Sequence, residues 1–107
     1  MQFMIIAHFN EKYNLLSVEK QQEGSRAEWA KSRDYYSLGL LRHAWVYEKD
    51  QGIVSIFETE SREQVEALLA DYPGAKGGWV SATILAIEPY WGFFPEQAEE
   101  LNHVIGH

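Results

Sequence analysis

Three side chains in the first half of the chain suit proton transfer and the binding of an acidic group: Glu28, Arg42 and His43. A partly buried carboxyl group has a raised pKa, which makes it a usable base near neutral pH. A histidine titrates in the same range, and an arginine binds a carboxylate through two parallel hydrogen bonds. Whether these groups act together depends on the elements that position them.

Arg42 and His43 are neighbours in the segment GLLRHAWVY, residues 39–47, which otherwise reads as a buried strand. Adjacent strand residues point to opposite faces of a sheet, so at most one of the two lines a given pocket unless a bulge or a neighbouring subunit intervenes. The alternation predicts that His43 shares its face with Leu41, Trp45 and Tyr47. The structural alternatives are a histidine bonded within an aromatic layer and an arginine paired with a helix carboxylate.

Glu28 falls within a predicted helix, on the same side as Gly24 and Tyr35. This side is about 80–100° around the helix from an apolar stripe, at ~100° per residue. The stripe consists of Val18, Trp29 and Tyr36. The position predicts a carboxyl group at the border between core and cleft. The alternative is a solvated glutamate that pairs with Lys31 or Ser32.

Further polar candidates are scattered along the chain. His8 lies on an otherwise apolar strand, and Tyr35 could supply a phenolic donor, although packing explains such a tyrosine more simply. His103 and His107 have a spacing of four, which suits one side of a helix facing a metal, but nothing nearby completes a ligand set. We therefore predict no metal site.

Composition narrows the class of protein. The 107 residues suffice for one domain, and 16 acidic against 9 basic residues give a net charge of −7. Such a chain binds phosphate backbones poorly, so no nucleic-acid partner is expected. The chain has no cysteine, no basic leader and no apolar run near the ~20 residues that span a bilayer. We expect a cytoplasmic protein that has no membrane partner.

Periodicity predicts strands over residues 2–9, 40–48, 53–58 and 79–87, with helices over 15–38 and from Ser61 to about 69. Residues 10–14 read as a polar connection and 72–78 as a glycine-rich loop. The order β-α-β-β-α-β predicts an α+β fold, a ferredoxin-like sandwich. Both sheet faces are apolar, so a second copy is expected to cover the free face and form a dimeric α+β barrel. Residues 1–90 form this domain, and 91–107 are an aromatic C-terminal extension that packs at an interface or forms a short helix.

An ordered set of residues extends over about residues 1–90. Glu28 stands eleven residues before Gly39, which precedes the signature Arg42-His43-x-Trp45. The rest of the set comprises Ser55-Ile-Phe57, Glu60-Ser61, Leu68-Leu69, Pro73 and Pro89. Through this set the chain resembles the muconolactone isomerase family.

The resemblance implies an isomerase without a cofactor that moves a proton across an unsaturated lactone in the degradation of aromatic compounds. Dehalogenation of chlorinated lactones is a related activity in the group. The resemblance also implies homodimers, which in characterised members assemble into decameric rings. Glu28 matches the family's proposed catalytic glutamate, and His43 is the second catalytic candidate. The candidates for binding the small-molecule substrate are Arg42, Trp45, Tyr35 and His8.

The chain departs from the family where the lactone pocket is shaped. Val46 replaces a basic residue after the signature tryptophan, and the segments 48–51 and 74–77 also differ. A different aromatic-derived or polyketide-like substrate is therefore reasonable. Two other classes of protein stay open: a non-catalytic oligomeric binding or accessory protein, and a dimeric-barrel monooxygenase that acts on aromatic polyketides without a cofactor.

Overall fold

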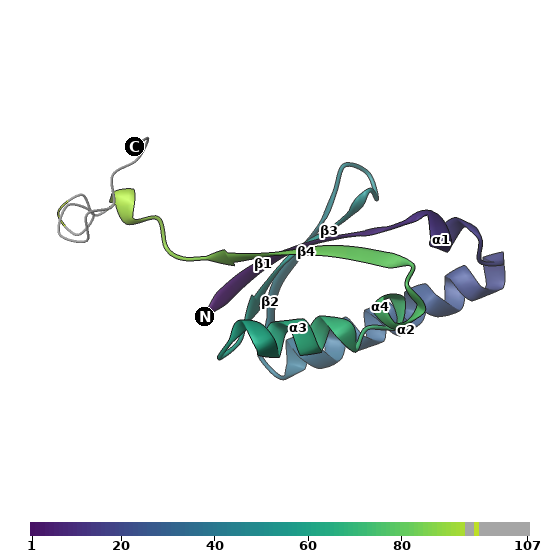
Figure 1. Ribbon diagram of the computed structural model, residues 1–107, viewed down its shortest axis with the longest axis horizontal. Helices are drawn as coiled ribbons and strands as arrows, with labels where there is room; N and C mark the ends of the chain where they lie inside the picture. The colour runs from purple at the N-terminus through teal and green to yellow at the C-terminus, as the bar shows by residue number, and fades with distance from the viewer. Residues whose placement is uncertain (94–95, 97–107) are drawn as a thin grey trace.

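A computed structural model describes residues 1–93 and 96, and shows one antiparallel sheet with its helices on one face (Figure 1). The strands are β1 (Gln2–Phe9), β2 (Leu41–Tyr47), β3 (Gly52–Glu58) and β4 (Val80–Ile87), in the order β2-β3-β1-β4. The helices are α1 (Glu11–Asn14), α2 (Val18–Ser37), α3 (Arg62–Ala70) and α4 (Pro73–Gly77), followed by a 3-10 turn at Trp91–Phe93. The predicted ferredoxin-like α+β fold is confirmed.

Two segments predicted to lack regular structure contain short helices. In place of the polar connection, α1 begins after Asn10, whose side chain accepts a hydrogen bond of 2.9 Å from the Lys12 N–H. In place of the glycine-rich loop, α4 begins at Pro73, since proline suits the first helical position. It ends at Gly77 and is capped by Gly78, whose φ of 76° is a left-handed conformation that glycine adopts without strain.

The long helix α2 starts later than predicted and runs without a break. Ser17 caps it by accepting a hydrogen bond of 3.2 Å from the Lys20 N–H. Gly24 marks a close approach to Trp79, because a Cβ there would lie 2.8 Å from Cζ2 of that ring. A Cβ on Gly77 would lie 2.5 Å from Nε1 of the same ring. The indole therefore packs where both α2 and α4 have glycine, and this packing holds α4 against α2.

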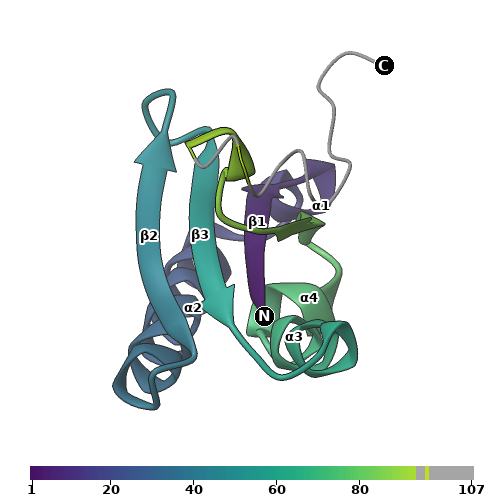
Figure 2. The ribbon, with the colours of Figure 1, turned by 90° about the vertical axis from the view of Figure 1, so that its left-hand side faces the viewer.

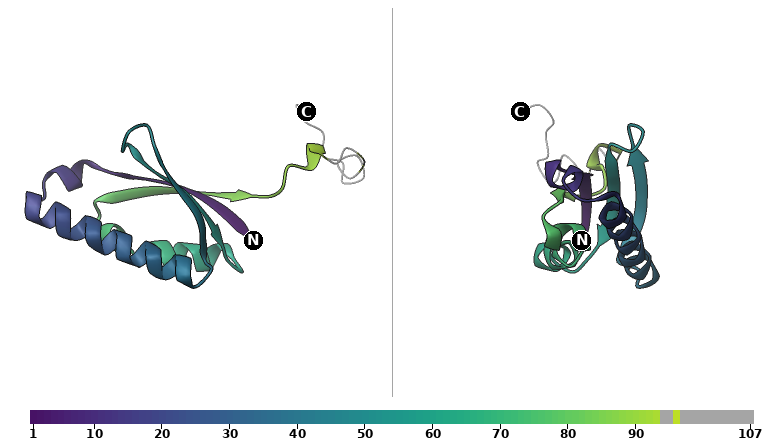
Figure 3. Two further views of the ribbon diagram at one scale, coloured as in Figure 1. Left: turned by 180° about the vertical axis from the view of Figure 1, so that it is seen from behind. Right: turned by 90° about the vertical axis from the view of Figure 1, so that its right-hand side faces the viewer.

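The core lies between the sheet and the helical layer, which Figure 3 shows from two further sides. Its buried members are Phe3, Ile5, Leu41, Phe57, Tyr35 and Val65. The apolar stripe of α2 is not its core side, because all three stripe residues are exposed. The side of α2 that carries Tyr35 faces the sheet instead. Toward the N-terminus of α2, the same side contains Gly24, Glu28 and Ser32.

Because of a β-bulge in β2, His43 does not share a face with Leu41, and this part of the prediction is wrong. Leu41 pairs with Phe57 and His43 with Ile56, so the register shifts at Arg42. Leu41 therefore joins the core, whereas His43 shares the opposite face, called the outer face below, with Trp45 and Tyr47. Figure 2 views the strands β2, β3 and β1 from that side, with α2 and α3 behind them.

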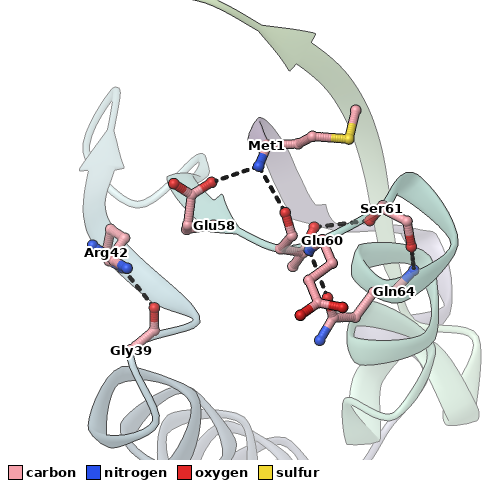
Figure 4. Close-up of polar contacts among 8 residues, drawn as sticks. Met1, Gly39, Arg42, Glu58, Glu60, Ser61 and Gln64 are labelled. Carbon is pink, nitrogen blue, oxygen red and sulfur yellow. Dashed lines mark hydrogen bonds and ion pairs between the residues drawn. The ribbon is translucent and has the colours of Figure 1, made fainter.

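Side chains at both ends of the first turn cap the start of α3, near the start predicted at Ser61. The Ser61 hydroxyl accepts a hydrogen bond of 3.1 Å from the Gln64 N–H, and the Gln64 side chain accepts one of 2.7 Å from the Glu60 N–H (Figure 4). Close by, the N-terminal amine lies 3.0 Å from a carboxylate oxygen of Glu58. In the part of the chain that the structure describes, no helix has the length and apolar character needed to cross a membrane.

Candidate functional site

An apolar cleft lies between the sheet and α2. It has an inner part of about 300 Å³ and an outer part of about 560 Å³. The two parts have in common Ala7, Glu28, Ser32, Ala44, Ile53 and Val80. They are therefore two ends of one cleft, and Glu28 stands where they meet.

Glu28 is half-buried in this cleft and is fixed by the backbone of α4. Its Oε1 accepts a hydrogen bond from the Gly74 N–H, which lies in the first turn of α4 and has no partner within the helix. A Cβ on Gly74 would lie 2.7 Å from that oxygen and 2.4 Å from Cγ2 of Val80. Position 74 therefore requires glycine for the carboxyl group to reach the backbone.

Burial raises the pKa of Glu28, and this effect outweighs the hydrogen bond from Gly74, which lowers the pKa. Burial also raises the pKa of Tyr72, in the inner part of the cleft, to about 12, against a lowering hydrogen bond with Ser32. The negative charge of Glu28 adds to that increase. The cleft thus combines a carboxyl group that titrates closer to neutrality with a phenol that keeps its proton.

The neighbours of Glu28 on α2 have partners elsewhere. The Ser32 hydroxyl lies 2.8 Å from the Tyr72 hydroxyl, and Lys31 forms an ion pair of 2.5 Å with Asp71. Neither residue pairs with Glu28 in the structure, so the alternative of a solvated glutamate paired with Lys31 or Ser32 is wrong.

The structure places the predicted strand residues away from this carboxyl group. His43 and Trp45 are exposed on the outer face, where their rings stack with centroids 5.6 Å apart and an angle of 12° between the planes. Arg42 is exposed, and its Nε donates a hydrogen bond of 2.6 Å to the Gly39 carbonyl (Figure 4). None of the three lines the cleft.

The remaining two predicted residues differ in position. Tyr35 is buried in the core, where its hydroxyl donates a hydrogen bond of 2.6 Å to the Leu68 carbonyl. His8 borders the outer part of the cleft, with Nδ1 3.3 Å from the Ser81 carbonyl oxygen. Of the six predicted site residues, the structure therefore brings Glu28 and His8 to the cleft. His103 and His107 lie outside the described residues.

The sequence interpretation did not select Ser32, Tyr72 or Gly74 for the site. Ser32 follows Glu28 by four residues on a helix, a spacing that puts both on one side and could have identified it. Tyr72 is 40 residues from Ser32 and has no local signal. Within residues 1–93 and 96, no group of acidic and histidine side chains is arranged to hold a metal ion.

These residues form a site suited to proton transfer. A half-buried carboxylate accepts a proton from a carbon acid, and neighbouring hydroxyls donate hydrogen bonds to an oxygen that gains charge. The apolar walls and the partial burial of Glu28 lower the local dielectric constant, which strengthens both effects.

The fold is similar to those of two enzymes of known structure. One is 5-chloro-2-hydroxyhydroquinone dehydrochlorinase from Burkholderia phenoliruptrix, in complex with 2,5-dihydroxybenzoquinone, with a TM-score of 0.64 and 17% identity over 82% of this chain and 94% of that one. The other is muconolactone isomerase, with a TM-score of 0.66 and 18% identity over 84% and 93%. No family model matches the sequence, and no curated protein matches it. The resemblance expected from the sequence is thus confirmed at the level of the fold.

Proposed function

We propose that the chain is a cytoplasmic enzyme that transfers a proton within a small aromatic-derived or lactone substrate, with Glu28 as the base. The main support is the half-buried carboxyl group of raised pKa in an apolar cleft. In the reaction, the C–H bond next to a carbonyl breaks, the proton goes to Glu28 and the electron pair becomes an enolate. Glu28 then returns the proton to a different carbon. This chemistry requires no cofactor.

The structural neighbours support this reaction class. One is an isomerase and the other a dehydrochlorinase, and a dehydrochlorination removes a proton from the substrate together with chloride. The proposal does not extend to a particular lactone.

The roles predicted for His43, Arg42 and Trp45 stay predictions. Because these side chains lie outside the cleft of their own subunit, a catalytic role for them requires that they reach the cleft of another copy.

The decisive experiment is the Glu28→Gln substitution, with Glu23→Gln as the matched control on the exposed surface of α2. Exchange of substrate hydrogen for solvent deuterium is measured by NMR over a panel of unsaturated lactones and ring ketones. We expect exchange with the wild type and with Glu23→Gln, and a loss of about 10²–10⁴-fold with Glu28→Gln. An unchanged rate in the Glu28→Gln protein removes Glu28 from the mechanism.

The hydrogen bond from Gly74 to Glu28 supports a second candidate, a non-catalytic binding protein in which the carboxylate only caps α4. The same experiment separates the two functions. Such a protein would bind members of the panel without accelerating exchange in any of them.

We also propose that the chain is a homodimer whose subunits pack through the outer face. Strand pairing aligns Met4 with Ile56 and Leu85, and Ile6 with Val54, so this face contains a contiguous apolar area. We expect a dimer by light scattering at micromolar concentration and a monomer for Ile6→Asp. Val18→Asp, at an exposed apolar position on α2, is the control that should stay dimeric. A monomeric wild type contradicts the proposal.

A further inference from the structure

We propose that the hydroxyl pair of Ser32 and Tyr72 binds the carbonyl oxygen of the ligand, and that the inner part of the cleft selects planar, uncharged ring carbonyl compounds such as quinones and cyclic enones. The assignment of a catalytic step to this pair rests on the proposed function of Glu28. The binding of the neutral carbonyl does not, and it is tested separately.

The first observation is the position of the pair. Ser32 lies one turn after Glu28 on α2, and both line the inner part of the cleft with Tyr72. The Ser32 and Tyr72 oxygens are 2.8 Å apart, and no other partner of either hydroxyl is seen in the described part of the chain. Two hydroxyls have two hydrogens, and their mutual bond uses one. The other hydrogen is available for a ligand oxygen close to the Glu28 carboxyl group.

The second observation is the distribution of charge. Among the described residues that line the inner part, Glu28 is the one aspartate, glutamate, histidine, lysine or arginine. Arg33 and His8 line the outer part. A ligand carboxylate in the inner part would lie beside Glu28 without a cation to compensate for the loss of water. A neutral carbonyl avoids this cost and accepts the free hydroxyl hydrogen.

The third observation is the shape of the wall that the sheet contributes. Strand pairing places Ile5 beside Ile84 and Ala7 beside Ala82, and all four line the inner part. The two alanines leave room above the strands, and the two isoleucines extend the apolar surface along them. A flat ring packs against such a wall with little loss of contact.

The arrangement gives the pair a role in the reaction. When the C–H bond breaks and the proton moves to Glu28, negative charge develops on the carbonyl oxygen. The hydroxyl pair donates to that oxygen in the apolar cleft, where a hydrogen bond to a developing charge is strong. Tyr72 is protonated at neutral pH, and burial, which raises its pKa to about 12, keeps it so at higher pH as well.

The test is equilibrium binding by calorimetry at pH 7 with two probes of similar ring size, neutral 1,4-naphthoquinone and anionic 1-naphthoate. We expect the wild type to bind the quinone more tightly. Tyr72→Phe and Ser32→Ala should each weaken quinone binding by about 2–10-fold, the cost of one hydrogen bond, and leave naphthoate unchanged. Tyr36→Phe, at an exposed tyrosine of α2, is the matched control and should bind like the wild type.

A comparison within the Glu28→Gln background separates this proposal from the proposed function: adding Tyr72→Phe or Ser32→Ala to Glu28→Gln should still weaken quinone binding by about 2–10-fold, even if no substrate undergoes exchange. Circular dichroism checks the fold of each variant, and Ser32→Ala tests the pair if Tyr72→Phe does not fold. Equal binding of the two probes by the wild type overturns the selection of neutral rings. Wild-type quinone affinity in both hydroxyl variants overturns the role of the pair, and no quinone binding by the wild type overturns both.

Discussion

The helix-facing side of the sheet has two halves that differ in side-chain size and exposure. Toward the N-terminus of β1, Phe3, Ile5 and Phe57 are at most 1% exposed. Toward the β2–β3 hairpin, Ile53 is 41% and Val46 is 57% exposed on the same side of the same sheet. Figure 1 shows this hairpin rising away from the helical layer.

The difference follows from which side chains the helices and strands contribute. In the first half, Tyr35 of α2 and Val65 of α3 fill the space above the strands. In the second half, α2 contributes Glu28 and Ser32, and the strands contribute alanines, so a cleft stays open. The fold is thus stabilised mainly at one end of the sheet, and the candidate site begins where this core ends, with the core residues Ile5, Leu41 and Phe57 lining its inner part.

The largest effect should come from testing this division directly. Phe57→Ala removes a fully buried ring and should lower the free energy of unfolding by about 3–5 kcal/mol. Ile53→Ala removes a side chain from the same strand and the same face in the cleft half, and should cost less than about 1.5 kcal/mol because water already reaches it. Urea unfolding of both variants measures the contrast. Equal losses would show that the cleft half is packed as tightly as the core.

A smaller effect is expected at Gly74 of α4, which contacts Glu28 in the cleft. Gly74→Ala places a methyl group against Val80 and the Glu28 carboxyl group, which should cost about 1–3 kcal/mol of stability and displace the base. Gly77→Ala, in the same short helix, crowds Trp79 but not Glu28 and is the matched control. We expect similar stabilities for the two variants, and a larger loss of deuterium exchange with Gly74→Ala. If both lose exchange to the same extent, the position of α4 as a whole matters instead of the contact with Glu28.

The fold was predictable because its signals are local. Alternation located β1 with its bounds, and the Ser61 cap located the start of α3. The bulge at Arg42 was not predictable from alternation, and it moved Leu41 and His43 to opposite faces. The apolar stripe of α2 was misleading because the side of the helix that faces the cleft contains small and polar residues.

The candidate site was predictable only in part. Glu28 was identified from its position on the helix and from the family resemblance, and the structure places it in the cleft. The residues that complete the site come from a distant part of the sequence: Gly74 is 46 residues from Glu28 and Tyr72 is 44, so no spacing along the chain indicates them. Contacts of this kind arise from the packing of α4 on α2 and need the tertiary structure.

The smallest predicted effect is the decrease in the free energy of unfolding that the ionised Glu28 carboxylate causes in the cleft. Because burial raises the pKa of Glu28 in the folded protein, ionising this group costs the folded state more than the unfolded chain. The protein is therefore most stable below the unfolded value of 4.5, where Glu28 is protonated in both states, and it loses this stability as the pH rises through the folded pKa. Glutamine has no charge to desolvate, and its amide oxygen can still accept the Gly74 hydrogen bond. Glu28→Gln should therefore match the wild type at pH 4 and be the more stable protein at pH 7, by less than about 1 kcal/mol because solvent screens a half-buried carboxylate.

Urea unfolding at the two pH values measures this gain against Glu23→Gln, which removes an exposed charge from the same helix and corrects for the net charge of −7. A gain at pH 7 in Glu28→Gln alone, together with loss of exchange, would mean that the carboxylate is retained for its chemistry at a cost to the fold. If Glu28→Gln is instead the less stable of the two variants at pH 7, the ionised carboxylate stabilises α4. In that case Glu28 stabilises the fold, and the cleft half of the sheet contributes to folding as the core half does.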